Sequence, residues 1–428
     1  MDDASLDRYA RLLVEHAAGL RDGQALYIFG EIAHRDLALR IAEIGYDAGA
    51  GHVSTFLQDP RQLAQLVRRG RLERIELAHE SERAWLHQAL TDRAAMVSLR
   101  GEEDPRLMPQ VAREQPDRHA VFTRSATARG RVYTNHAVNR SLCPWVVAGV
   151  PTPGWARLVF PDLEEAEALE RLWDHVLAFT GADRDDFLEV ARAKDRHLHA
   201  RRRALDELAI RAVRIVGGGS DLRVALSSAS RWLGGSKDTV DGQRFLANVP
   251  TEENFTTPDR RGTEGRLVAT MPFRTRSGLL VEGLIMDFEA GRLSRFEATR
   301  GAEGFRRWID SDEGARYLGE LALVGSDSPI ARSGLFFEHT LYDENAWPHV
   351  ALGQAYTTGL IGGDTMSAAT LAKHGCNVSA IHTDIMVGST EVSVIATETR
   401  EGEVPLIRDG RWVDRFLAPP TEAPDASS

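Results

Sequence analysis

Apolar and polar positions alternate between strand-like and helix-like runs in the amino-terminal half of the chain. Residues 24–30 form an apolar run after a turn at 21–23, and this pattern predicts a buried strand. Apolar residues recur with helical spacing over 34–50, and apolar runs at 52–57 and 94–99 predict two more strands. The order strand, helix, strand predicts a βαβ unit and a largely parallel sheet.

The pattern changes after a long charged helical stretch at about 164–208. Apolar runs at 265–271, 279–288 and 293–298, joined by short turns with glycine, predict a hairpin meander. The other elements predicted in this half are a strand at 221–226, a helix at 306–318, and strands at 321–324, 381–388 and 391–397. The predicted fold class is therefore α/β and α+β: an amino-terminal βαβ-type domain is followed by a mixed α+β domain.

The length of the chain supports two domains, because 428 residues are enough for two separate cores. We predict an amino-terminal α/β domain at 1–200 and a carboxyl-terminal α+β domain at 201–416. The last residues, 417–428, are rich in proline and polar side chains and are predicted to be a disordered tail.

Composition and charge narrow the classes of partner. The net charge of -11 argues against a nucleic-acid partner, which would need a basic face. The sequence contains no apolar run near the ~20 residues that cross a bilayer, and its start lacks the features of a secretory signal. Its two cysteines, Cys143 and Cys376, are far apart and have no Cys-x-x-Cys partner. We therefore expect a reduced, cytoplasmic protein without a membrane partner.

Carboxylates and imidazoles accumulate in the later part of the chain. The candidates are Glu253, Glu320, Glu344, His349, Tyr356, His382 and Asp384. Several carboxylates near two imidazoles repel one another unless a cation lies among them. Taken singly, Glu253 and Glu344 also fit carboxylates at helix starts, and His349 fits a satisfied core residue. Taken together, the candidates predict a metal site.

Two local spacings indicate that some of these candidate residues lie close together in space. His349, Gly353 and Tyr356 stand at i, i+4 and i+7, so on a helix they would share one face. His382 and Asp384 stand at i and i+2 in an apolar run, so on a strand both would point the same way.

Glu320 and the ligand types restrict the site further. Glu320 ends the helix predicted at 306–318, where a carboxylate is unfavourable, and this position favours a specific partner such as a cation. Carboxylates and imidazoles without thiolate suit Zn²⁺, Co²⁺ or Mn²⁺, with Fe²⁺ as a further option. The candidates exceed the four ligands of one zinc, so two divalent ions that share a bridging carboxylate fit better.

The chain resembles the M29 family of metallo-aminopeptidases, the group of aminopeptidase T and aminopeptidase S. The resemblance covers nearly the whole chain, and its motifs in the second half are specific. The matching segments are 151–156, 159–162, 248–253, 281–283, 312–320, 327–330, 340–346, 351–356 and 382–389.

The resemblance implies a metal-dependent aminopeptidase whose metallopeptidase domain is the predicted domain at 201–416. It also implies a homodimer with an enclosed active-site cavity, and a peptide or small amide as substrate. Tyr356 would lie at the site. The residues implied to hold two divalent ions are Glu253, Glu320, Glu344, His349, His382 and Asp384, where the register of the motif selects Glu253 over Glu252.

Two departures from the family pattern bear on substrate choice. Trp347 and Pro348 stand where small or polar residues are commoner before the histidine, so the pocket wall there is expected to differ. Glu338 and His339 form an unusual pair before Thr340. Neither departure removes an implied ligand.

The mechanism we hypothesise is hydrolysis of an amino-terminal peptide bond. Glu320 would bridge two ions that lower the pKa of a shared water. Tyr356 would donate a hydrogen bond to the developing oxyanion, and Glu252 would carry the proton to the leaving amine.

Alternatives from other classes remain at this point. Ring-cleaving dioxygenases resemble this framework and use a single Fe²⁺, for which His349, His382 and Asp384 would form the ligands. Glu253, Glu320 and Glu344 would then be surplus carboxylates. A specialised amide hydrolase and a non-catalytic peptide-binding protein on the same fold are further alternatives.

Overall fold

The computed structural model describes residues 3–275 and 278–417, and a parallel sheet of five strands organises one half of it. The strand order is β2-β1-β3-β4-β9, and every neighbouring pair is parallel, as the βαβ pattern predicted. These strands are β1 (Ala25–Glu31), β2 (His52–Gln58), β3 (Ala95–Arg100), β4 (Trp145–Gly149) and β9 (Asn248–Val249). The apolar runs are continuous because helices cover both faces of a parallel sheet.

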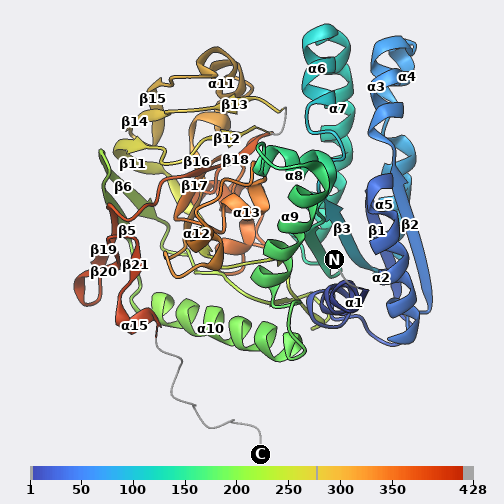
Figure 1. The fold of residues 1–428 in the computed structure, drawn as a ribbon. Helices are drawn as coiled ribbons and strands as arrows, with labels where there is room; N and C mark the ends of the chain where they lie inside the picture. Colours follow the sequence, from blue (N-terminus) through green and yellow to red (C-terminus); the bar gives the residue numbers. More distant parts are fainter. Residues whose placement is uncertain (1–2, 276–277, 418–428) are drawn as a thin grey trace, which may run out of the picture.

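Helices surround this sheet on the right of Figure 1. Two pairs, α3 with α6 and α4 with α7, pack into an extension with an apolar cluster of its own that includes Val67, Ile75 and Phe122. The helices of this half are α1 (Asp3–Arg11), α2 (Arg35–Asp47), α3 (Pro60–Arg69), α4 (Leu72–Glu76), α5 (Glu80–Thr91), α6 (Leu107–Glu114), α7 (Pro116–Tyr133), α8 (Pro153–Val159) and α9 (Glu165–Thr180).

The other half contains two antiparallel sheets that share a large apolar core. An eight-stranded sheet has the order β15-β14-β11-β6-β5-β19-β20-β21. Its strands are β5 (Ala212–Gly217), β6 (Ser220–Leu226), β11 (Pro258–Val268), β14 (Ile285–Glu289), β15 (Arg292–Glu297), β19 (Val392–Thr399), β20 (Gly402–Arg408) and β21 (Arg411–Trp412). A four-stranded sheet consists of β10 (Asn254–Thr256), β16 (Leu318–Leu323), β17 (His349–Gly353) and β18 (His382–Met386) in that order.

Short elements complete this half. They are the hairpins β7 (Lys237–Asp238) with β8 (Arg244–Phe245) and β12 (Phe273–Arg274) with β13 (Leu280–Val281), and the helices α11 (Ala302–Ile309), α12 (Pro329–Ser333), α13 (Thr340–Asp343), α14 (Ala368–Lys373) and α15 (Asp414–Leu417).

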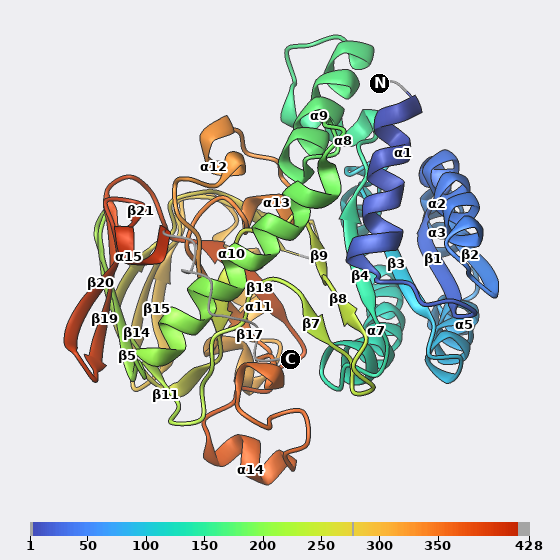
Figure 2. The ribbon, with the colours of Figure 1, turned by 90° about the horizontal axis from the view of Figure 1, so that it is seen from below.

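One long helix, α10 (Phe187–Glu207), runs along both halves (Figures 1 and 2). The helical stretch predicted at 164–208 is thus two helices. Gly181 separates them in the left-handed conformation, with φ of 75°, which glycine adopts at low cost. At its far end α10 is held by Arg201, whose Nε donates to the carbonyl oxygen of Phe416 at 3.2 Å.

Several sequence predictions are corrected by the structure. The helix predicted at 306–318 is wrong, because α11 ends at Ile309 and β16 already begins at Leu318. The strand predicted at 279–288 is divided into β13 and β14. Of the tail predicted at 417–428, residues 418–428 lie outside the described residues.

The division into domains at residue 200 stays a prediction. Strand β9, from the part predicted as the second domain, pairs with β4 of the parallel sheet. The two halves are therefore joined by the chain between β9 and β10, which carries Glu252 and Glu253.

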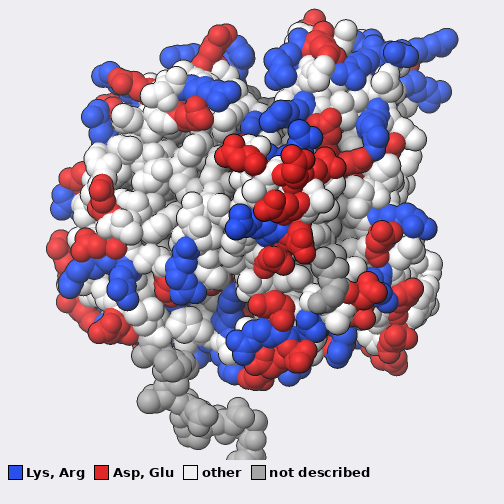
Figure 3. All heavy atoms as spheres, viewed as in Figure 1, with Lys and Arg blue, Asp and Glu red and all other residues white. Residues whose placement is uncertain are grey.

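Acidic and basic side chains mingle over the face drawn in Figure 3, and acidic ones gather near its middle, where α8 and α9 lie in Figure 1. Across the described ranges, no helix combines the length and apolar character that crossing a bilayer requires. Cys143 and Cys376 are both buried and free.

Candidate metal centre

Four of the predicted ligands lie on one face of the four-stranded sheet. In its register, Glu320 of β16 is opposite Ala351 of β17, and Ala351 is opposite Asp384 of β18. His349 precedes Ala351 by two residues and His382 precedes Asp384 by two, so both imidazoles emerge on the same face. The small side chain of Ala351 leaves room between the two carboxylates. The strand predicted for His382 and Asp384 is confirmed.

The other face of these strands is apolar and anchors the sheet in the core. Leu321, Val350, Leu352 and Ile385 alternate with the polar residues and are fully buried. Alternating polar and apolar residues on three paired strands therefore fix the direction of the candidate ligands.

Glu253 reaches the same site from the edge of the sheet. It directly precedes β10, which pairs with β16. Its Oε2 atom is buried 3.3 Å from Nε2 of His349 and makes no well-formed hydrogen bond to another described residue. A buried carboxylate oxygen without a donor is costly unless a cation approaches it.

Two overlapping groups of ligand atoms result among the described residues. Glu253, Glu320 and His349 form one group, and Glu320, His382 and Asp384 form the other; within each, one ligand atom per residue lies within 4.8 Å of the others. Nε2 of His382 is 3.2 Å from Oε2 of Glu320 and 3.3 Å from Oδ1 of Asp384. We call these five residues the acidic centre, and Glu320 is common to both groups.

Backbone carbonyl groups orient the two imidazoles. Nδ1 of His382 lies 2.8 Å from the carbonyl oxygen of Gln354, and Nδ1 of His349 lies 3.3 Å from that of Trp347. A proton on each Nδ1 leaves Nε2 free to face the carboxylates. This arrangement is typical of histidines that bind metal ions.

The electrostatics of the acidic centre reflect crowded charges. Burial and the charges of Glu253 and Asp384 raise the pKa of Glu320 to about 7. Burial alone would lower the pKa of His349, but Glu253, together with the charges of Asp384 and Glu320, outweighs burial and raises that pKa to about 9. Burial would raise the pKa of Asp384, yet His382 holds it below its ordinary value. The imidazoles thus act as cations among these carboxylates, which is the role that a bound metal ion would take over.

Tyr356 lies beside this centre, although not by the predicted route. The helix that would align His349, Gly353 and Tyr356 is wrong, because residues 349–353 form strand β17. Gly353 ends the strand with φ of 108°, a conformation that favours glycine, and the chain then turns. The ring centroid of Tyr356 is 4.9 Å from that of His382. Burial and the charges of Glu320 and Asp384 raise the pKa of Tyr356 well above its ordinary value, so its hydroxyl keeps its proton.

Glu344 lies next to the acidic centre but belongs to neither group. It follows the last residue of α13, so the helix-start interpretation of Glu344 is wrong. Burial and the charges of Asp384 and Glu253 raise its pKa well above the ordinary value. Its Oε1 accepts a hydrogen bond from Nδ2 of Asn248 at 3.5 Å.

The local positions predicted for Glu253 and Glu320 are also corrected. Glu253 precedes a strand and not a helix, and Glu320 lies inside β16 and not at a helix end. His349 is the first residue of a strand.

Glu252 belongs to neither ligand group among the described residues. Its carboxylate forms an ion pair with Lys194 of α10, and its backbone N–H donates to Oδ1 of Asn345 at 2.7 Å. Sequence reasoning missed Lys194 and Asn345. Their contacts span 58 and 93 residues, and no local pattern in the sequence announces them.

The acidic centre fits a divalent metal. Its donors are carboxylate oxygens and imidazole nitrogens, with no thiolate among them, and this set suits Zn²⁺, Co²⁺, Mn²⁺ or Fe²⁺. Further positive charge is needed at Oε2 of Glu253, which makes no well-formed hydrogen bond to a described residue, and at the shared carboxylate of Glu320.

This chain is similar to a known protein family and to characterised proteins over nearly its whole length. A family model described as thermophilic metalloprotease (M29) matches residues 2–412 of this chain. Aminopeptidase T of Thermus aquaticus is 36% identical over 416 residues, which cover 96% of this chain and 98% of that protein. Aminopeptidase AmpS of Bacillus subtilis (strain 168) is 31% identical and covers 95% of this chain and 98% of its own length.

A solved structure shares the fold as well. Wild-type AmpT from Thermus thermophilus superposes with a TM-score of 0.84 at 33% identity, covering 96% of this chain and 99% of that chain. The match to the family model, over residues 2–412, thus includes both halves of the molecule.

Proposed function

Since this chain belongs to the M29 family of metallopeptidases, we propose that it removes amino-terminal residues from peptides with two divalent ions held in the acidic centre. The observation that carries the proposal is the pair of ligand groups that share Glu320. One ion would be held by Glu253, Glu320 and His349, and the other by Glu320, His382 and Asp384. Glu344, which lies beside both groups, is our further proposed ligand.

Bound divalent ions supply Lewis acidity, which lowers the pKa of a water molecule and polarises a carbonyl oxygen. The protein contributes the rigid placement of the ligands. Glu320, His349, His382 and Asp384 stand on paired strands whose opposite face is locked in the apolar core. Such placement reduces the reorganisation that the reaction requires.

Tyr356 is the proposed hydrogen-bond donor in this reaction. Its raised pKa keeps a proton on the phenol oxygen at neutral pH, and its ring packs against that of His382. A donor fixed at this position would stabilise negative charge that develops on the carbonyl oxygen of the scissile bond. The proton-transfer role predicted for Glu252 remains a prediction, and the ion pair with Lys194 argues against it.

The single-iron alternative is not favoured. It requires His349, His382 and Asp384 around one ion, but among the described residues His349 falls in one ligand group and His382 with Asp384 in the other. It also leaves Glu253 and Glu320 as buried carboxylates without a function.

Three further properties are part of this proposal. We propose a homodimer on the family resemblance, and a cytoplasmic location because both cysteines are free. We propose Zn²⁺, Co²⁺ or Mn²⁺ as the metal, since the donor set does not separate them.

The proposal is tested by release of arylamide reporters from a panel of amino acids. The protein is first stripped of metal and then supplied with Zn²⁺, Co²⁺, Mn²⁺ or Fe²⁺ under air and under argon. We expect cleavage that metal restores and that does not depend on oxygen. Cleavage that needs both iron and oxygen, or a protein that binds no divalent ion, would overturn the proposal.

A further inference from the structure

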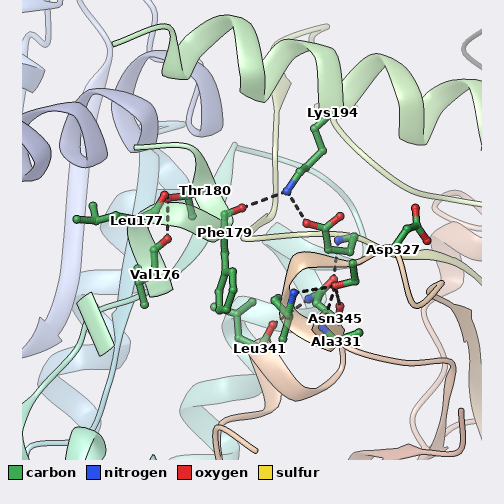
Figure 4. A network of polar contacts seen from close by, with 12 residues as sticks. Val176, Leu177, Phe179, Thr180, Lys194, Asp327, Ala331, Leu341 and Asn345 are labelled. Atoms are coloured by element: carbon green, nitrogen blue, oxygen red, sulfur yellow. Dashed lines mark hydrogen bonds and ion pairs between the residues drawn. The ribbon is translucent and has the colours of Figure 1, made fainter. Parts of the chain in front are cut away.

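Helix α10 contacts the chain on the amino-terminal side of Glu253. Lys194 points from α10 towards the joint between the halves (Figure 4), and its Nζ donates to the carbonyl oxygen of Phe179 at 3.1 Å. The same Nζ pairs with the carboxylate of Glu252. Because the Glu252 side chain is only 13% exposed, this ion pair is largely withdrawn from solvent. Removing one member of such a pair leaves the other charge without compensation.

The same helix also contacts the chain on the carboxyl-terminal side of Glu253. Nδ2 of Asn254 donates to the carbonyl oxygen of Leu198 at 3.0 Å and to that of Leu233 at 3.2 Å, and Asn254 is fully buried. Lys194 and Leu198 are one helical turn apart, so a single face of α10 holds both neighbours of Glu253.

Asn345 adds a third connection to this segment. It is fully buried, its Oδ1 accepts from the N–H of Glu252 at 2.7 Å, and its Nδ2 donates to the carbonyl oxygen of Leu341 at 2.8 Å. Its own carbonyl oxygen accepts from Oγ of Ser328 at 2.7 Å (Figure 4). Asn345 therefore ties the Glu253 segment to the turn that carries Glu344.

Apart from the contact of its Oε2 with Nε2 of His349 at 3.3 Å, the carboxylate of Glu253 has no comparable fixing of its own among the described residues. Its Oε2 makes no well-formed hydrogen bond to another described residue, so its position depends on the backbone on either side. The backbone is in turn held by Glu252 and Asn254.

We propose that Lys194 is a positioning residue for the acidic centre: by holding the carboxylate of Glu252, it sets the place of Glu253 and the metal affinity of the group Glu253, Glu320 and His349. This inference rests on the proposed function, because it assigns a role relative to bound metal. It gives Glu252 a structural partner on α10 in place of a step in proton transfer. The second group, Glu320, His382 and Asp384, stands on β16 and β18, and the polar contacts described for Lys194 go to Phe179 and Glu252 instead, so this group is expected to be insensitive.

The experiment titrates metal-stripped protein with Co²⁺ in the presence of a competing chelator. The visible absorption of the bound ion measures how much Co²⁺ the protein holds. We expect two binding steps in the unaltered protein. In Lys194→Met one step weakens by about 10-fold to 100-fold, the cost typical of losing an orienting partner behind a metal ligand. The other step stays within about twofold, and Lys194→Arg, which retains the charge, recovers most of the loss.

Matched variants separate this role from a general loss of structure. Arg196→Met changes an exposed cation on the same helix, 63% exposed and paired with Glu189, and is expected to leave both steps unchanged. Glu252→Gln removes the negative charge that pairs with Lys194 but keeps an oxygen that accepts a hydrogen bond. If Lys194→Met does not fold, the titration is made with Glu252→Gln. We expect Glu252→Gln to weaken the same single step.

The outcomes are distinct for the two proposals. Unaltered affinities in folded Lys194→Met and Glu252→Gln, or an equal weakening of both steps, would overturn the positioning role. An unaltered protein that binds no Co²⁺ would instead overturn the proposed function.

Discussion

The acidic centre and a second acidic cluster bury similar groups in two parts of the molecule but satisfy them differently. The second cluster lies where β1 and β3 of the parallel sheet end, and it consists of Glu31, His34, His339 and Asp343, of which His34 and Asp343 are the most buried. In the acidic centre, carboxylates face one another and two imidazoles, and the pKa of His349 rises to about 9. In the second cluster, burial lowers the pKa of His34 and of His339 to about 4.

Burial accounts for the protons held in the second cluster, and it outweighs backbone donors that favour the ionised carboxylates. Asp343 accepts hydrogen bonds from the N–H groups of Phe337 and His339, each at 2.9 Å, and Glu31 accepts from the N–H of Glu103 at 2.8 Å. Burial raises the pKa of Asp343 to about 8 and that of Glu31 to about 7. The second cluster therefore contains protonated carboxyl groups and neutral imidazoles. The acidic centre instead contains charged imidazoles next to carboxylates.

This contrast shows that burial of acidic residues is not by itself the mark of a metal site. In open parallel sheets, ligands bind beyond the carboxyl ends of the strands, at the point where the strand order reverses. Here that point, between β1 and β3, is filled by His34, whose Nε2 lies 2.7 Å from the carbonyl oxygen of Gly101. The proposed ligand-binding chemistry lies instead on the antiparallel sheet, where carboxylates face imidazoles.

The largest effect is expected from Glu320→Gln, which removes the ligand common to both groups. We expect loss of detectable peptidase activity and weaker metal binding at both steps. Because Glu253 and Asp384 repel Glu320, the metal-free variant should unfold at a temperature no lower than the metal-free parent. Turnover with arylamide substrates and thermal melts test this. Retained turnover in a folded variant would contradict the shared role of Glu320.

Metal removal should affect stability through the acidic centre alone. A ligand at a hundredfold excess over its dissociation constant stabilises the native state by about 2.7 kcal/mol. We therefore expect a chelator to lower the melting temperature of the parent protein by several degrees, and excess metal to restore it. Glu320→Gln is the control, since the chelator should shift its melting temperature much less. An equal shift in both proteins would place the stabilising metal elsewhere.

The second cluster should control the pH dependence of stability instead. The pKa of Glu31 is about 7 in the folded protein and near its ordinary value of 4.5 when unfolded, so the folded state binds the proton more tightly. The stability that this proton contributes is complete below pH 4.5, falls as pH rises and is lost above pH 7, a change on the order of 3 kcal/mol.

Glu31→Gln cannot ionise and removes this contribution. Urea unfolding of the parent and variant across this range measures it, and the stability of the parent relative to the variant should decline with rising pH. A difference that stays flat or grows would contradict the assignment, whereas metal affinity is expected to remain the same in both proteins.

Asp343→Asn should produce the smallest effect. One oxygen that accepts a backbone N–H becomes an NH₂ group, which leaves a buried donor unpaired and costs about 1 to 2 kcal/mol of stability. Both metal-binding steps should be unchanged. Denaturant unfolding and the same Co²⁺ titration test the two statements, and weakened metal binding would show that the clusters are coupled.

Much of the fold follows from periodicity. The strands predicted at 24–30, 52–57 and 94–99 correspond to β1, β2 and β3, because apolar runs on a parallel sheet are continuous. The i, i+2 spacing of His382 and Asp384 likewise predicted strand β18 and a shared face.

Other features depend on partners far away in sequence. The spacing of His349, Gly353 and Tyr356 fits a helix, but pairing with β16 and β18 makes 349–353 a strand. A tertiary context of this kind overrides local propensity. For the same reason, the ion pair of Lys194 with Glu252 has no local signature.

The central claim is that divalent ions bind where buried carboxylates face imidazoles. Anomalous diffraction from crystals soaked in Co²⁺ tests it most directly. We predict two peaks in the acidic centre, one beside Glu253 and His349 and the other beside His382 and Asp384, with none near Asp343. A peak in the second cluster, or a single peak bound by both histidines, would contradict the account.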